Sequence, residues 1–200
     1  MFSANNANWS LSIVTPPIDE PVTLEEVKAH LRVDFDDDDF YIAALIYAAR
    51  EITEQKTNRA LITQTWDYIL DDFPCVNEIK LRKPSLQSVT SVNYTTSDGV
   101  EHVMSTDDYI VDTKSNPGRI FLGFSKIWPP VVLQPASAVR IRFVAGYSSG
   151  NEVPQALKHA MFFLIAHFYE NREPISKDIV NKIPMTFDFL IGPYRVVTLQ

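Results

Sequence analysis

The sequence contains little cysteine, little glycine and no long apolar stretch. A single cysteine, Cys75, among 200 residues excludes an internal disulfide framework and any metal site made only of cysteines. Six glycines leave little material for the glycine-rich loops with which many enzymes hold phosphate groups, whereas prolines number 13. No window approaches the roughly 18 consecutive apolar residues of a membrane-spanning helix. Because the first twenty residues contain no Lys or Arg, we expect no secretory signal.

Basic residues are also scarce. Lys plus Arg number 18 against 25 Asp plus Glu, which gives a net charge of −7. A protein that binds nucleic acid or anionic membranes through a general electrostatic surface needs a basic face, so the acidic balance argues against that class. The sequence is 46% hydrophobic, which is enough for a sizeable core. We therefore expect a globular protein that is made in a reducing cytoplasm.

The N-terminal quarter contains a proline-rich segment followed by two helical patterns. Residues 1–22 are polar and then rich in proline, which favours an extended arm. The run Thr23-Leu24-Glu25-Glu26 is a capping box, and apolar residues at helical spacing after it predict a short helix over 23–32. The acidic run Asp36 to Asp39 suits the positive end of a helix dipole. A longer helix is predicted over 37–57.

The middle of the chain changes to a period of two. From Thr63 to Gly146, apolar residues alternate with polar ones in six or seven short runs separated by turn residues such as Ser115-Asn116-Pro117-Gly118. This pattern predicts an antiparallel β domain. After it, Pro154 opens a third helical pattern that ends before Pro174. The fold class is therefore α+β.

One motif has the form of a catalytic element. Gly146-Tyr147-Ser148-Ser149-Gly150 matches the G-x-S-x-G nucleophile elbow of serine hydrolases and follows a predicted strand. An elbow leads directly from the serine into a helix, whereas residues 151–153 intervene here. The order of serine, acid and histidine also fails, because no histidine follows Asp178. A small hydrolase that uses Ser148 is a distant alternative to a loop between strand and helix.

Two patterns resemble metal sites incompletely. Asp34 begins a D-x-D-x-D run typical of calcium loops, but the sixth position is Asp39 rather than glycine and the twelfth is Leu45 rather than glutamate. His167 and Glu170 share a helical face, yet no second helix repeats the pair as metal-binding bundles require. The sequence predicts no cofactor, and a loose cation site at the acidic run is an alternative to a solvated helix start.

The C-terminal segment, 174–200, is apolar but irregular. Pro184 and Gly192-Pro193 interrupt it, so it is unsuited to one long helix. Such a segment is costly to expose to water, which indicates a subunit that completes itself in an assembly.

Short motifs along residues 14–196 resemble, in their order and spacing, the head-tail connector proteins of tailed bacteriophages and prophages, also called head-completion or adaptor proteins. These motifs are PVTLEEVKAHLRVD (21–34), AARE (48–51), TNRALITQTW (57–66), PSLQSV (84–89), NPGRI (116–120), WP (128–129), GY (146–147), VP (153–154), LK (157–158), HFYENRE (167–173) and PYR (193–195). No single motif is specific; their combined order carries the resemblance.

The resemblance implies a structural virion protein without enzymatic activity. It implies a ring of twelve copies beneath the portal protein, and this ring joins the DNA-filled capsid to the tail or stopper protein. Genomic DNA passes through such a ring without sequence-specific binding, and no membrane is involved. The expected location is the head-tail junction of the virion, reached from the host cytoplasm during assembly. The alternative is a tail-completion or other minor virion structural protein.

The combined prediction divides the chain into four parts. Residues 1–22 are an N-terminal arm, 23–62 and 147–173 are a helical connector core of about three main helices, 63–146 are an inserted antiparallel β domain, and 174–200 are an extended docking tail. The tail is predicted to contact the portal or a neighbouring subunit through Ile183, Phe187, Phe189, Leu190, Pro193, Tyr194 and Arg195. The acidic run is predicted to line the DNA channel, where it repels phosphate, through Asp36, Asp37, Asp38 and Asp39.

Overall fold

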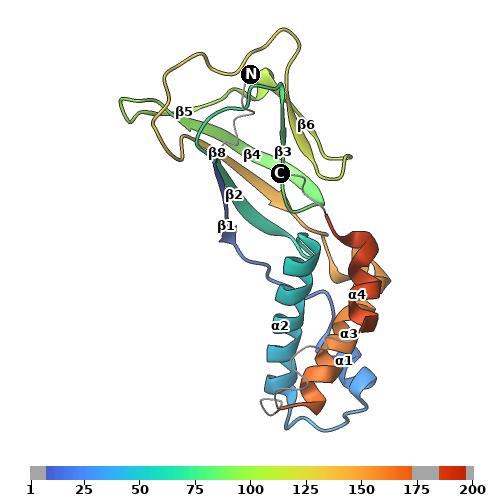
Figure 1. Ribbon diagram of the computed structural model, residues 1–200. Helices are drawn as coiled ribbons and strands as arrows, with labels where there is room; N and C mark the ends of the chain where they lie inside the picture. Colours follow the sequence, from blue (N-terminus) through green and yellow to red (C-terminus); the bar gives the residue numbers. More distant parts are fainter. Residues whose placement is uncertain (1–7, 173–184, 197–200) are drawn as a thin grey trace. The chain divides into compact units, whose positions relative to one another are not determined.

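The computed structural model describes residues 8–172 and 185–196 and has a mixed α+β fold, as the sequence predicts (Figure 1). The chain divides into two units that are each discontinuous in sequence. The sheet unit contains residues 1–16, 63–146 and 198–200, and the helical unit contains residues 17–62 and 147–197. Each unit has its own core.

In the part that the structure describes, residues 8–16 and 63–146, the sheet unit contains two antiparallel sheets. In the larger sheet the strands are ordered β1-β2-β8-β4-β5, and in the smaller sheet β3-β7-β6. The strands of the larger sheet are β1 (Trp9–Thr15), β2 (Gln64–Leu70), β4 (Leu86–Thr95), β5 (Glu101–Val103) and β8 (Val139–Ala145). Those of the smaller sheet are β3 (Glu78–Lys80), β6 (Tyr109–Asp112) and β7 (Arg119–Leu122), with the short 3-10 helix η1 (Thr106–Asp108) before β6.

Strand β8 shows why the period of two forms a sheet here. Its residues 139, 141, 143 and 145 are buried, whereas the arginines between them are partly exposed. Phe143 pairs with Trp66 of β2 and Val89 of β4, so the central strand is covered by apolar partners along both edges. On the opposite face, Arg142 donates two hydrogen bonds of 2.8 Å to the carboxylate of Asp67. Alternation therefore divides this sheet into an apolar face and a face of ion pairs.

The predicted N-terminal arm is wrong for residues 9–15. They form the edge strand β1, which pairs antiparallel with β2 from Trp9 opposite Leu70 to Thr15 opposite Thr65. The guanidinium of Arg82 lies 3.6 Å from the centre of the Trp9 ring. Trp9, Leu11 and Ile13 have the alternation of a strand, and the backbone of this run finds its hydrogen-bond partners in a strand more than fifty residues later.

Over its described residues, 17–62, 147–172 and 185–196, the helical unit contains four α-helices and two 3-10 helices. The helices are α1 (Leu24–Leu31), α2 (Asp39–Thr57), α3 (Gln155–Glu170) and α4 (Met185–Ile191), with η2 (Gly150–Glu152) before α3 and η3 (Gly192–Tyr194) after α4. The predicted capping box is confirmed: the Thr23 backbone N–H donates to Glu26 Oε2 at 2.8 Å, and the Glu26 N–H donates to Thr23 Oγ1 at 3.1 Å.

Helices α2 and α3 lie side by side and supply most of the core of the helical unit (Figure 1). Each helix turns one apolar face toward the other, because its buried residues recur at helical spacing. The fully buried members of this core include Ile42, Ala49, Leu157, Met161, Leu164 and Ile165. Among the described helices, none has the length and apolar content needed to cross a lipid bilayer.

The predicted docking tail is partly wrong, because its described portion folds onto its own unit. Phe187 and Ile191 of α4 are fully buried in the same core as α2 and α3. The Arg59 side chain donates a 2.6 Å hydrogen bond to the carbonyl oxygen of Tyr194, and the Val196 N–H donates to the Thr57 carbonyl at 3.0 Å. Phe187 and Ile191, two of the apolar residues that suggested an external partner, are thus buried within the unit. Ile183 lies outside the described residues.

Candidate functional site

The acidic run before α2 is largely ion-paired. The Lys28 ammonium group donates to Asp36 Oδ1 and to Asp39 Oδ1, both at 2.7 Å. Asp38 accepts hydrogen bonds from the Tyr169 hydroxyl at 2.5 Å and from the Arg172 guanidinium at 2.6 Å. Two cations from α1 and from the end of α3 therefore compensate three of the four carboxylates.

These contacts shift the titration of the groups involved. The hydrogen bond from Lys28 lowers the pKa of Asp36, and the hydrogen bond from Arg172, followed by that from Tyr169, lowers the pKa of Asp38. The bond to Asp38 in turn raises the pKa of the Tyr169 hydroxyl. The shifts of Asp36 and Asp38 favour their charged forms, while the hydrogen-bond partners weaken the field of these two carboxylates.

Asp37 is the exception in the acidic run. It is exposed and has no ion-pair partner among the described residues. Asp34, three residues earlier, is also exposed. Of the four predicted channel residues, Asp37 therefore contributes an uncompensated charge, whereas Asp36, Asp38 and Asp39 bind segments of the helical unit together. Lys28 lies in the motif of residues 21–34, but the sequence gives no sign that it forms ion pairs with Asp36 and Asp39. Those ion pairs form because folding brings α1 next to the start of α2.

A second group of charges is buried beneath the segment that precedes α1. The guanidinium of Arg50, which is 4% exposed, lies 2.9 Å from Glu20 Oε2 and 3.2 Å from Glu54 Oε2. Glu54 also accepts a 2.7 Å hydrogen bond from the Leu61 N–H. Burial raises the pKa of Glu20, against the opposing attraction of Arg50. The network ties three separate segments together and leaves little of its charge available to a ligand.

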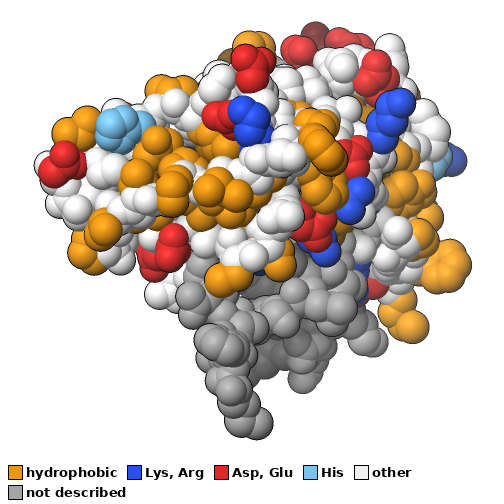
Figure 2. All heavy atoms as spheres, turned by 90° about the horizontal axis from the view of Figure 1, so that it is seen from above, with side chains coloured by type: hydrophobic (Ala, Val, Ile, Leu, Met, Phe, Trp, Pro, Cys, Tyr) orange, Lys and Arg blue, Asp and Glu red, His pale blue; other side chains and the backbone are white. Residues whose placement is uncertain are grey.

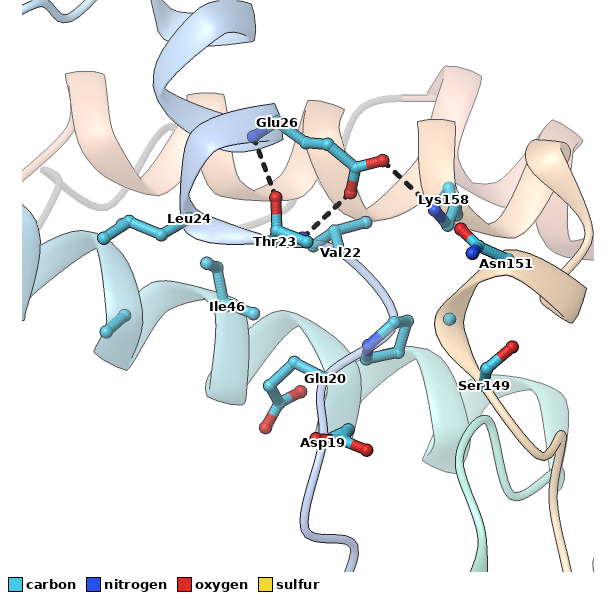
Figure 3. A pocket seen from close by; sticks show the side chains of 13 residues that line it. Asp19, Glu20, Val22, Thr23, Leu24, Glu26, Ile46, Ser149, Asn151 and Lys158 are labelled. Atoms are coloured by element: carbon cyan, nitrogen blue, oxygen red, sulfur yellow. Dashed lines mark hydrogen bonds and ion pairs between the residues drawn. The ribbon is translucent and has the colours of Figure 1, made fainter.

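An open pocket of about 470 Å³ lies between this segment and the loop before α3 (Figure 3). Glu26 lies above it and joins two elements: its carboxylate accepts from the Thr23 N–H and lies 3.3 Å from the nearly buried Lys158 ammonium group. Asp19 and Glu20 form the opposite wall, and Ser149 lines it from the loop. Each charged group in the pocket that is well buried is already paired, so the pocket resembles a junction between segments more than a reaction site.

The loop at Ser148 does not assemble hydrolase chemistry. Ser148 is exposed, and its backbone N–H donates to Glu152 at 3.2 Å. The short helix η2 separates it from α3, as the intervening residues 151–153 suggested. His159 and His167 both lie on α3, where their rings contact phenylalanines. Within residues 8–172 and 185–196, no cluster of three His, Cys, Asp or Glu residues could hold a metal ion.

The predicted tail contacts fall into two classes. Phe187 is fully buried, and Leu190 and Tyr194 are partly buried against the core. By contrast, Phe189 is 81% exposed on the outer side of α4, and Pro193 and Arg195 are exposed beside it; Arg195 forms an ion pair with Asp188 at 2.5 Å. Met185, which the sequence did not single out, is 90% exposed. Only the outward residues of α4 and η3 are accessible to a partner.

Charge differs between the two units. The sheet unit contains nine acidic and eight basic residues, and on the face seen in Figure 2 the two signs lie next to one another. Ion pairs there include Arg119 with Asp112 at 2.9 Å and Lys126 with Asp108 at 2.6 Å. The helical unit contains sixteen acidic and ten basic residues. Almost the whole net charge of the protein therefore belongs to the helical unit.

Solved structures from gene transfer agent (GTA) particles share this fold. A chain from the neck of an empty GTA particle, computed with C6 symmetry, is 23% identical with a TM-score of 0.78, covering 96% of this chain and 97% of that one. A chain from the virion of the native particle is 22% identical with a TM-score of 0.78, over 95% and 97%. A chain from the native neck computed with C12 symmetry is 23% identical with a TM-score of 0.74, over 96% and 97%. At these identities the likeness establishes the fold.

Sequence comparison supplies the family. A search of curated proteins found no significant match. The model of the family described as "Head completion protein", however, matches residues 20–180, which include the whole of α1, α2 and α3 and every strand after β1. The match spans most of the chain and both units, and it agrees with the motifs from which the resemblance was drawn. The chain belongs to the head completion protein family.

Proposed function

We propose that this chain is a ring-forming head-tail connector, which docks beneath the portal protein and joins the DNA-filled capsid to the tail or its stopper. The observation that carries the proposal is the family match over residues 20–180. The shared fold with neck chains of GTA particles, including one computed with C12 symmetry, supports it. Membership of the head completion protein family also supports a structural rather than an enzymatic role.

In this proposal the two units have different tasks. The helical unit is the connector core, and residues 63–146 are a domain inserted into it, since the chain leaves the helical unit after Ile62 and returns at Tyr147. A parallel bridge between Ile62 and Tyr147 holds the two ends of the insertion together. Because the two ends of the insertion lie side by side, its sequence can change without disturbing the helical core around it. Such a domain is suited to contact a neighbouring protein that varies.

The portal contact is assigned to the outward face of α4 and η3. Phe189 and Pro193 are exposed there, and Arg195 is held next to them by Asp188. Phe187, Leu190 and Tyr194 take the different role of fixing α4 onto the core, because their side chains are wholly or partly buried in it. The exposed Phe189 lies on a helix that the core holds rigidly, which lowers the entropy cost of docking.

The channel lining is assigned to Asp37 with support from the acidic excess of the helical unit. A ring of negative charge around a DNA path repels phosphate and reduces sticking. Charge reversal at Asp38 would also break its bonds to Tyr169 and Arg172, so Asp37→Lys is the cleaner variant. Asp19→Lys, at another exposed carboxylate of the same unit, is the matched control.

The decisive experiment removes the gene from the phage or prophage that encodes the chain. We expect DNA-filled heads without tails, together with free tails, when particles are examined by electron microscopy. Restoring the wild-type gene should restore joined particles, whereas Phe189→Glu should restore a folded protein that fails to join the neck. Normal tailed particles from the deletion strain would refute the proposed function. For the channel, Asp37→Lys should slow DNA ejection relative to Asp19→Lys, and equal rates would refute the lining role.

A further inference from the structure

Helix α2 carries an apolar stripe on the side that faces solvent. Phe40 is 95% exposed and Tyr47 is 52% exposed, and the exposed Ala44 lies between them. These positions are spaced by four and then three residues, so their side chains follow one line along the helix. The residues that α2 contributes to the core, such as Ile42 and Ala49, lie on the opposite side of the helix. A solvent-facing line normally carries polar residues, so this stripe has the composition of a contact surface.

A second, chemically different face lies on α1 and α3. The His30 ring of α1 stacks on the Phe162 ring of α3 with centroids 5.2 Å apart, and it meets the edge of Phe163 at 6.2 Å. His159 contacts the same Phe162 ring from one turn earlier, with centroids 5.9 Å apart. His30, His159 and Phe163 are all exposed. The result is a face of aromatic and imidazole rings, in which Phe162 also packs against the core whereas His30, His159 and Phe163 are turned to solvent.

The two faces point in different directions. Helices α2 and α3 pack together through their inner lines, which include Ile46 of α2 and Leu164 of α3. Because the α2 stripe and the exposed His159 and Phe163 line each lie on the side of the helix away from that contact, they face outward on opposite sides of the helix pair. A two-fold dimer uses one patch twice, whereas a closed ring needs two different patches per subunit. The helical unit presents the second arrangement.

Charge also distinguishes the two faces. The stripe is followed along α2 by exposed Glu51, which has no ion-pair partner among the described residues. The other face contains two imidazoles, those of His30 and His159. A carboxylate beside an apolar stripe and imidazole N–H groups on an aromatic face complement each other as hydrogen-bond acceptor and donors.

We propose that the Phe40, Ala44 and Tyr47 stripe packs head-to-tail against the His30, Phe162 and Phe163 face of a second copy of this chain. This inference rests on the proposed ring-forming function and specifies its subunit interface. Phe40 and Tyr47 supply the aromatic contact area, and Ala44 between them permits the close approach of a facing helix. Glu51 lies toward the imidazoles of the neighbouring copy. Repetition of this contact by rotation closes the ring.

Cysteine cross-linking in assembled particles tests the interface. The background is Cys75→Ser, because Cys75 is exposed and would form disulfides of its own. The double variant Ala44→Cys with Phe163→Cys should give, on mild oxidation of purified particles, a ladder of covalent oligomers longer than a dimer. Ala44→Cys with His159→Cys tests the adjacent register and avoids loss of the Phe163 ring. Ala44→Cys with Met185→Cys is the matched control, since Met185 is exposed on α4, and should give no ladder.

The outcomes separate the interface from the proposed function. A ladder from either interface pair, with none from the control, supports head-to-tail packing. Dimers from Ala44→Cys alone would show that α2 packs against itself and would overturn the inference. Absence of any ladder while the protein is present in the neck would also overturn it and leave the connector function standing. If the protein is absent from the necks of purified particles, the proposed function fails and this interface fails with it.

Discussion

Two phenylalanines of α4, two residues apart, should differ sharply in their effect on stability. Phe187 is fully buried in the core of the helical unit, whereas Phe189 is 81% exposed. Truncation of a buried phenylalanine removes its transfer free energy and leaves a cavity, so Phe187→Ala should lower the free energy of unfolding by about 3–5 kcal/mol. Phe189→Ala removes a side chain that water already surrounds and should change it by less than about 0.5 kcal/mol.

Separate probes can follow the two units in this experiment. Trp9, Trp66 and Trp128 all belong to the sheet unit, so tryptophan fluorescence reports its unfolding. Far-ultraviolet circular dichroism reports mainly the helices of the other unit. For a unit of roughly 100 residues, about 3 kcal/mol corresponds to a fall in melting temperature of more than about 10 °C. The loss of stability in Phe187→Ala should appear in the unfolding transition followed by circular dichroism, in urea or on heating.

The result that would refute this reasoning is equally specific. Equal melting temperatures for Phe187→Ala and the wild type would mean that α4 is not part of the core. Equal losses for Phe187→Ala and Phe189→Ala would mean that helix formation, rather than burial, stabilises the segment. In either case the tail would again be available as a detached docking element, and the role assigned to Phe187 would be wrong.

Three further predictions concern local features of both units. Thr23→Ala should lower the stability of the helical unit by about 1 kcal/mol in urea titrations followed by dichroism, because it removes the α1 cap. Gly150→Ala should lower its melting temperature, since a Cβ there would lie 2.9 Å from a backbone oxygen, whereas Gly192→Ala, with open space around it, should not; equal effects would contradict the packing. In the sheet unit, the hydrogen bond from Arg119 lowers the pKa of Asp112 from 3.8 to about 2, so this stabilisation is complete above the unfolded value and is lost as pH falls toward 2. Asp112→Asn should therefore flatten the decline in the fluorescence midpoint over that range, and an unchanged pH profile would count against the ion pair.

Local patterns predicted local structure well in this chain. The Thr23 to Glu26 capping box is present as predicted, and the alternation in 63–146 forms strands because each apolar line finds a buried face. Strand β1 was missed because its alternating run is short, and its partner is separated from it by two helices. Helix α4 was missed because seven residues show barely two helical turns, and the adjacent glycine and proline suggest a break.

The candidate surfaces were less predictable than the fold. The acidic run is visible in the sequence, but its compensation by Lys28 and Arg172 depends on which helices the fold brings together. Among the tail residues, Phe187 is buried and Phe189 is exposed. The sequence alone does not distinguish the two, because it does not show which face of α4 packs against the core. The spacing of Phe40, Ala44 and Tyr47 predicts that they share one side of α2. Whether that side is buried in the core or exposed as a contact surface is known only from the structure.

The pairing of β1 with β2 has a consequence for the order in which the chain folds. This contact joins Trp9 to Leu70 and encloses both α1 and α2 in the intervening loop. Those two helices in turn complete their core with α3 and α4, whose residues are synthesised after the last strand. The large sheet therefore cannot form completely until β8 has been synthesised, and the helical core cannot form completely until α4 has been synthesised. Because these long-range contacts close only after the loops between them are ordered, we expect slow, mainly post-translational folding, with exposed aromatic surface persisting until synthesis is nearly complete.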